Sequence, residues 1–107
     1  MRVCTYRREA SIQEPMNSET FAEFEARALA QGFNDVLVRE WAPGQVVGTH
    51  THPFDVSALV VRGEVVLTCH GEGRALRAGQ PFELPRDTPH DERYGPEGAT
   101  FWVARRN

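Results

Sequence analysis

Short runs of strand-forming residues, separated by glycine and proline, fill the chain from Phe33 to its end. The runs cover residues 35–41, 56–61, 64–69, 74–77, 82–84, 88–94 and 100–105. Proline interrupts a strand because it lacks a backbone donor, and glycine because it readily adopts turn conformations. Many short strands at this spacing are typical of a β-sandwich or a β-barrel. The pattern therefore predicts an all-β fold.

One segment before the strands, residues 17–31, has the residue pattern of a helix. Thr20 and Glu23 have the spacing of a capping box, and Gly32 supplies a C-terminal stop. Its apolar side chains fall on one face, which is expected to pack against the strands: Phe21, Phe24, Ala28 and Leu29. The all-β fold is thus predicted to carry one short N-terminal helix.

The length of 107 residues suits one domain with an ordinary core. We expect a single domain over residues 1–107, with an extended arm at 1–16, the helix at 17–32 and the strands at 33–107. Two cysteines, Cys4 and Cys69, are too few for a disulfide framework. Both are expected to be reduced thiols that pack as small hydrophobes.

Charge and hydropathy argue against two classes of partner. Fifteen acidic and twelve basic residues give a net charge of −3, and the basic residues are scattered, so nucleic acid is not expected as a partner. The longest apolar run, residues 58–61, is far shorter than the roughly 20 residues of a membrane-spanning helix. The start of the chain has no signal-peptide core, so a cytoplasmic location is expected.

Two of the four histidines, His50 and His52, stand in a His-x-His pair. Alternate residues of a strand point to one face, about 6 to 7 Å apart at the backbone, so two imidazoles can bind one ion. The pair alone is weak evidence for a metal site, because surface histidines often stand in such pairs by chance. The residues around the pair strengthen the interpretation.

The spacing of glycine, proline and histidine resembles the two motifs of the cupin superfamily over residues 39–103. The first motif is matched in register by Gly44, His50, His52 and Gly63, and the second by Gly79, Pro85 and His90. The resemblance implies a double-stranded β-helix, or jelly-roll, barrel. It also implies that His50, His52 and His90 bind one divalent metal ion, and that the protein is a homodimer.

Three positions depart from the family pattern. Val56 stands where the family has a glutamate ligand, Asp87 where it has glycine, and Tyr94 where it has asparagine. The missing ligand leaves one or more coordination positions for water or substrate. Asp55 is next to the lost glutamate, but a regular strand turns it away from the ion, and only a bulge would bring it back.

Glu92 and Tyr94 share the strand parity of His90 and are the candidate catalytic residues. Glu92 is the candidate acid or base, and its alternative is an exposed glutamate paired with Arg93 or Arg74. Tyr94 offers a phenolic hydroxyl to a ligand, or else fills the core. The fourth histidine, His70, lies in a predicted hairpin turn and is expected to be exposed.

The strand at 56–61 is apolar on both faces. One face is expected to line the cavity, through Val56, Ala58 and Val60, and the other to point away from it, through Ser57, Leu59 and Val61. A strand that is apolar on both faces is covered on both, which predicts a packed helix or a second subunit behind this sheet.

Three histidines without a thiolate suit zinc, iron(II), nickel, copper or manganese, in that order. We expect a metal-dependent enzyme, such as a dioxygenase or isomerase, that acts on a small polar metabolite. The alternatives are a barrel that binds or senses a small molecule or metal without turnover, and a metal-free structural barrel. The sequence names no substrate.

Overall fold

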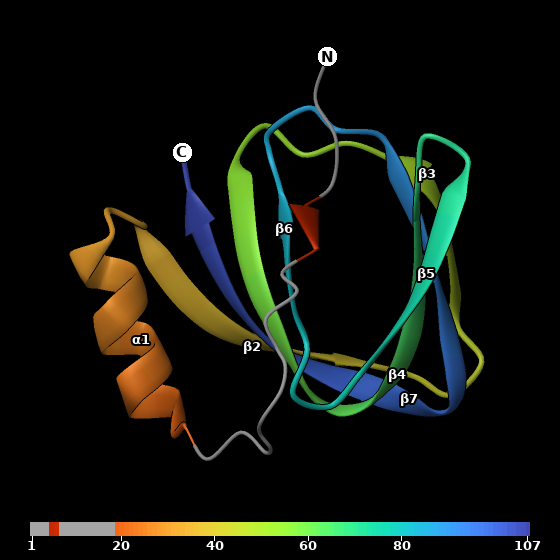
Figure 1. The fold of residues 1–107 in the computed structure, drawn as a ribbon, viewed down its shortest axis with the longest axis horizontal. Coiled ribbons are helices and arrows are strands. Elements are labelled where there is room, and N and C mark those ends of the chain that lie inside the picture. Colours follow the sequence, from red (N-terminus) through yellow and green to blue (C-terminus); the bar gives the residue numbers. More distant parts are fainter. Residues whose placement is uncertain (1–4, 7–18) are drawn as a thin grey trace.

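Strands dominate the computed structural model, which describes residues 5–6 and 19–107 (Figure 1). In chain order the elements are β1 (Thr5–Tyr6), α1 (Phe21–Ala30), β2 (Asp35–Trp41), β3 (Val46–His50), β4 (Asp55–Cys69), β5 (Glu72–Arg77), β6 (Pro81–Leu84) and β7 (His90–Arg106). Most of the predicted arm at 1–16 lies outside the described residues. From that arm only β1 is described, and it pairs with β6.

Two long strands, β4 and β7, run antiparallel beside each other along most of their length and build both halves of the barrel. In one half the strand order is β1-β6-β4-β7-β2. In the other half β5 pairs with the second part of β4, and β3 pairs with the first part of β7. The ribbon closes around a central space (Figure 1). The predicted all-β, double-stranded β-helix barrel with one short helix is confirmed.

Each of these long strands replaces two strands that the sequence predicted. The runs at 56–61 and 64–69 join in β4, and those at 88–94 and 100–105 join in β7. Gly63 bends β4 instead of ending it, with φ +80°. A Cβ at this position would collide with the carbonyl oxygen of Gly98, so the bend requires glycine.

Helix α1 covers the outer face of the sheet in which β4 and β7 are neighbours. The capping box is confirmed, since the Glu23 N–H donates to the Thr20 hydroxyl and the Thr20 N–H donates to the Glu23 carboxylate. The helix and the sheet share a small apolar cluster, whose buried members are Phe24, Ala28, Leu59 and Ala104. Leu29 departs from the predicted apolar face, because 48% of its surface is exposed.

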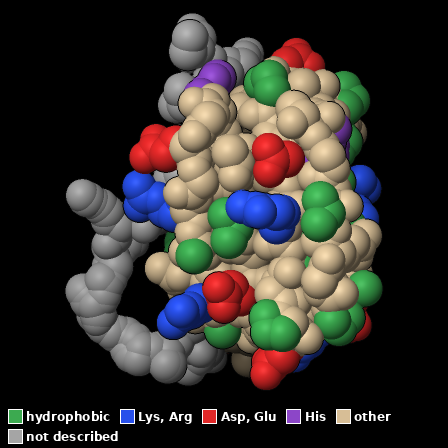
Figure 2. Space-filling view, turned by 90° about the vertical axis from the view of Figure 1, so that its right-hand side faces the viewer, with side chains coloured by type: hydrophobic (Ala, Val, Ile, Leu, Met, Phe, Trp, Pro, Cys, Tyr) green, Lys and Arg blue, Asp and Glu red, His purple; other side chains and the backbone are tan. Residues whose placement is uncertain are grey.

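The inner faces of the strands form the main core. Its buried members include Val56, Ala58, Val60, Leu67, Phe82 and Phe101. The prediction for 56–61 is confirmed, because Leu59 packs beneath the helix on the other side. The helix therefore explains why this strand is apolar on both faces. On the outer face shown in Figure 2, hydrophobic and charged side chains are interspersed.

The end of β4 corrects one prediction and confirms another. Cys69 is buried and disulfide-bonded, so the expectation of a reduced thiol there is wrong; Cys4 lies outside the described residues. His70 is exposed, as predicted, in the two-residue turn between β4 and β5. Over residues 5–6 and 19–107, no helix has the length and hydropathy needed to span a membrane.

Candidate metal centre

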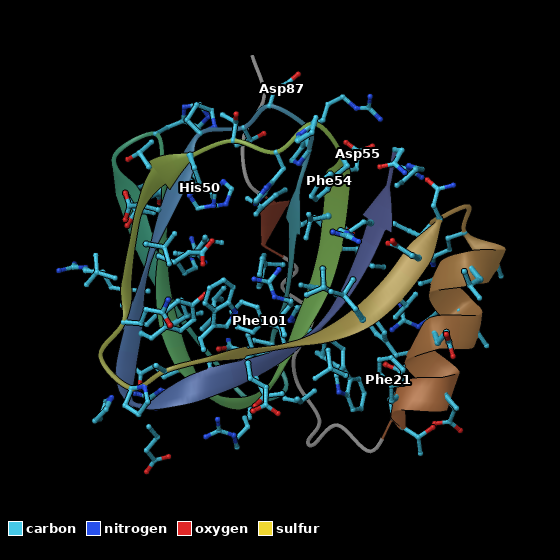
Figure 3. All side chains as sticks on the ribbon, turned by 180° about the vertical axis from the view of Figure 1, so that it is seen from behind. Phe21, His50, Phe54, Asp55, Asp87 and Phe101 are labelled. Atoms are coloured by element: carbon cyan, nitrogen blue, oxygen red, sulfur yellow. The ribbon has the colours of Figure 1, made fainter. Side chains whose placement is uncertain are left out.

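Strand pairing brings two of the three motif histidines together at one end of the barrel. His50 is the last residue of β3, and it pairs with His90, the first residue of β7. In Figure 3 the labelled His50 lies close to the end of β3. His52 follows two residues beyond β3, which corrects the expectation that His50 and His52 share a strand. The ring of His52 stacks on Phe54, with centroids 5.0 Å apart.

The three imidazoles converge. The ring centroids of His50 and His90 are 4.2 Å apart, and the His52 ring lies 4.9 Å from the first and 5.1 Å from the second. One nitrogen from each ring can be chosen so that all three lie within 4.8 Å of one another. The structure therefore brings together the residues that the sequence proposed as ligands.

Backbone carbonyls orient two of these rings. The Nδ1 atom of His50 lies 2.7 Å from the carbonyl oxygen of Gly48, and that of His90 lies 2.9 Å from the carbonyl oxygen of Thr88. A carbonyl only accepts, so each Nδ1 carries the proton, and in the neutral ring Nε2 carries the lone pair. The same arrangement holds metal-bound histidines in place in other proteins.

Glu92 faces the two Nε2 atoms. Its Oε2 atom lies 3.3 Å from Nε2 of His90 and 3.6 Å from Nε2 of His50. Its Oε1 atom accepts a hydrogen bond of 2.5 Å from the hydroxyl of Tyr94. Because Glu92 is only 8% exposed, the alternative of an exposed glutamate paired with Arg93 or Arg74 is wrong.

Burial and mutual charge shift the pKa values of this group. Burial raises the pKa of Glu92, but contact with His90, the Tyr94 hydrogen bond and positive charge on the histidines outweigh it, and the net shift is downward. Burial lowers the pKa of His90, and Glu92 and the Thr88 carbonyl reverse this. Burial and the neighbouring histidines lower the pKa of His52. Burial and the Glu92 charge raise the pKa of Tyr94, so it stays a donor.

Sequence comparison identifies the family of this barrel. Residues 37–101 match the family model of the cupin domain, which is more than half of the chain. The chain belongs to the cupin family. No curated protein matches this cupin in sequence.

Solved structures with the same fold include three relatives of this cupin. A double-stranded β-helix protein from Klebsiella pneumoniae is 27% identical, with 66% of this chain and 64% of that chain covered and a TM-score of 0.59. KdgF from a Halomonas species is 24% identical, with 67% of each chain covered and a TM-score of 0.58. The DMSP lyase DddQ from Ruegeria pomeroyi is 23% identical, with 67% and 37% covered and a TM-score of 0.62. This cupin thus spans about two thirds of the first two relatives and little over a third of the lyase.

The departures from the cupin motifs each have a place in the structure. Val56 is buried and lines the cavity. Asp55 is engaged elsewhere: it accepts a hydrogen bond of 2.7 Å from the backbone N–H of Arg86 and pairs with Arg106 at 3.3 Å. Asp87, at the position of the family glycine, has a left-handed backbone with φ +62°, and its N–H donates to the His52 carbonyl oxygen at 2.8 Å.

A cavity of about 100 Å³ adjoins the histidines, and its other walls are largely apolar. Among the side chains that line it are Leu37, Trp41, Phe54, Phe82, Phe101 and Val103. Sequence reasoning did not select Arg39, which also lines this cavity. Its alternation with Leu37 and Trp41 along β2 was the available signal.

Proposed function

We propose that this cupin binds one divalent transition-metal ion through His50, His52 and His90 and acts as an enzyme on a small molecule in the adjoining cavity. The observation that carries the proposal is the buried Nε2 atom of His90, which has no hydrogen-bond partner among the described residues and faces a carboxylate. A lone pair beside a carboxylate is repulsive unless a proton or a cation lies between them.

The donor set fits a transition metal. Three neutral imidazoles with a nearby carboxylate suit zinc, iron(II), nickel, copper or manganese, and zinc and iron(II) fit best. When bound, such an ion polarises an oxygen of the substrate or activates water or dioxygen. The carbonyls of Gly48 and Thr88 support this fit, because they hold two of the rings with Nε2 available.

Glu92 is the proposed acid–base residue. Its Oε2 atom faces the Nε2 atoms of His90 and His50, so the carboxylate is placed to accept a proton from a molecule beside the histidines. Tyr94 is proposed as a positioning residue, because its hydroxyl already donates to Glu92. Contact of the Tyr94 hydroxyl with a ligand stays a prediction, and the buried ring of Tyr94 fits the alternative that it fills the core.

Metal content tests the site directly. Protein purified without added metal is compared with His50→Ala, His90→Ala and, as the matched control, His70→Ala, which is exposed in the turn between β4 and β5 and is not among the three converging histidines. We expect about one metal ion per chain in the wild type and the control, and loss of most of it in the other two variants. Equal trace metal in all four proteins would overturn the proposal.

Turnover separates the enzyme from a binding or sensing barrel. Metal-loaded protein is assayed for oxygen consumption and for product formation with panels of small acids, thiols, phenols and sugars. An enzyme loses turnover in Glu92→Gln while it keeps metal and binds the substrate. A protein that binds metal and ligand but turns over none of these compounds is the non-catalytic alternative.

The homodimer and the cytoplasmic location stay predictions. Light scattering coupled to size-exclusion chromatography tests the dimer, because the apolar pattern of β4 is already explained by the helix. The disulfide bond of Cys69 counts against the location, since the cytoplasm keeps most thiols reduced. The single domain over residues 1–107 likewise stays a prediction.

A further inference from the structure

The side chain of Arg39 projects from the face of β2 that points into the barrel. In the ladder between β2 and β7, Leu37 pairs with Val103 and Arg39 pairs with Phe101. Directly opposite residues of an antiparallel pair lie on the same face of the sheet. Val103 and Phe101 belong to the interior core, so Arg39 shares their face. A charged residue at an inward position of a barrel calls for a physical explanation.

The Arg39 side chain reaches the cavity beside the histidines. Arg39 lines this cavity and remains exposed, so it stands at the open side. Its guanidinium carbon lies 4.7 Å from the centre of the Trp41 ring. Trp41 in turn stacks on Tyr94, with ring centroids 5.1 Å apart. Packing therefore holds the Arg39 charge on the wall that also positions Glu92.

The second arginine that lines this cavity, Arg105, has a carboxylate partner, whereas Arg39 has none among the described residues. Arg105 donates hydrogen bonds of 3.1 and 2.8 Å to the carboxylate of Asp35, so its charge is neutralised. Across residues 5–6 and 19–107, Arg39 has no carboxylate within 4.0 Å and no hydrogen-bonded side chain. A planar guanidinium with free donors is suited to bind a carboxylate in a bidentate manner.

Charge and shape together define the ligand class. Among the described residues that line the cavity, Glu92 is the single carboxylate. With a divalent cation at the histidines the cavity has an excess of positive charge, which favours an anion. Apart from these polar groups its walls are apolar, and its volume of about 100 Å³ is below the roughly 300–1,000 Å³ of pockets for drug-sized ligands.

We propose that Arg39 binds the carboxylate of a small organic acid, whose apolar body packs against Leu37 and Phe101 and whose other end faces the histidines. The inference rests on the proposed function in one respect, namely that the end of the acid away from Arg39 faces a metal ion held by the histidines. Arg39 then sets the specificity for acids over neutral molecules of the same shape.

Matched pairs of acid and amide test this assignment. Isobutyrate, crotonate and lactate are titrated against isobutyramide, crotonamide and lactamide, with tryptophan fluorescence as the readout because Trp41 contacts Arg39. We expect at least one acid to bind roughly tenfold or more tightly than its amide. We expect the Arg39→Gln variant to bind that acid about tenfold more weakly than the wild type does and to bind the amide with unchanged affinity. Arg77→Gln, an exposed arginine on β5, is the matched control.

Two results would overturn the assignment: no acid binds better than its amide, or Arg39→Gln binds the acid as well as the wild type does. The titrations are repeated after the metal is removed with a chelator. Arg39 is on β2 and is not one of the proposed metal ligands, so we expect its effect on acid affinity to persist after the metal is removed. Bound metal with no Arg39 effect contradicts this inference alone. An Arg39 effect in a protein that never binds metal contradicts the proposed function alone.

Discussion

Two carboxylates near the histidines, Asp55 and Glu92, differ in the partners that surround them. Glu92 is buried between two imidazoles and the Tyr94 hydroxyl, which gives it a place in the site. Asp55 faces the backbone of Arg86 and the side chain of Arg106, which gives it a structural role. Asp55 stands one residue before the inward-facing Val56, and on a strand this offset sends its side chain to the opposite face.

The Asp55→Asn variant tests this structural role through its pH dependence. The hydrogen bond from the Arg86 N–H, helped by Arg106, lowers the pKa of Asp55 below its ordinary value despite some burial. When folding lowers the pKa of a carboxyl group, its ionised form stabilises the folded state. This stabilisation is complete at pH values above the unfolded-state pKa of about 3.9, and it is lost as the pH falls through the lower folded-state pKa.

We therefore expect Asp55→Asn to lower the free energy of unfolding by about 1 kcal/mol at pH 7. The difference from the wild type is expected to shrink as the pH falls below about 4. Urea unfolding at pH 7, 5 and 3.5 measures both quantities. A difference that stays constant over this range contradicts the charge argument.

At the scale of elements, the bend in β4 is the feature that most constrains the sequence. Gly63→Ala places a methyl group against the carbonyl oxygen of Gly98 and also puts alanine at φ +80°. Gly79→Ala is the matched control, since φ is +94° there but the space around it is open. The control isolates the cost of the collision from the cost of the conformation.

We expect Gly63→Ala to be less stable than Gly79→Ala by about 1 to 3 kcal/mol. Chemical denaturation of both variants and the wild type measures the difference. Equal losses in the two variants would mean that the collision is relieved by a small backbone shift.

The same bend shows where sequence reasoning reached its limit. Caps and parity are local, so the helix and the alternation along β4 were predictable from neighbouring residues. The inward placement of Glu92 depended in addition on the resemblance that put His90 in the barrel, and parity alone left an exposed Glu92 open. Whether Gly63 ends a strand or bends it depends on pairing with β7, which is distant in sequence. Arg39 was missed for a related reason: β2 is apolar on both faces, so its inward side was ambiguous until the pairing was known.

At the scale of the whole molecule, the proposed metal would join segments that are distant along the chain. His50 and His52 precede β4, and His90 begins β7. A ligand that binds only the folded state stabilises it by about 2.7 kcal/mol at 100 times its Kd. We expect a chelator to lower the melting temperature of the wild type by several degrees and to leave His90→Ala unchanged. An equal decrease in both proteins would show that the chelator acts elsewhere.

Because β4 and β7 belong to both halves of the barrel, they limit how a molecule can enter or leave the interior. The halves are unable to swing apart as rigid bodies, because any such hinge motion would break the ladders that run through both. Opening of the interior is therefore expected to depend on local movement of connections between strands, such as residues 51–54 and 85–89. Exchange rates should follow the flexibility of these two connections, one of which carries His52.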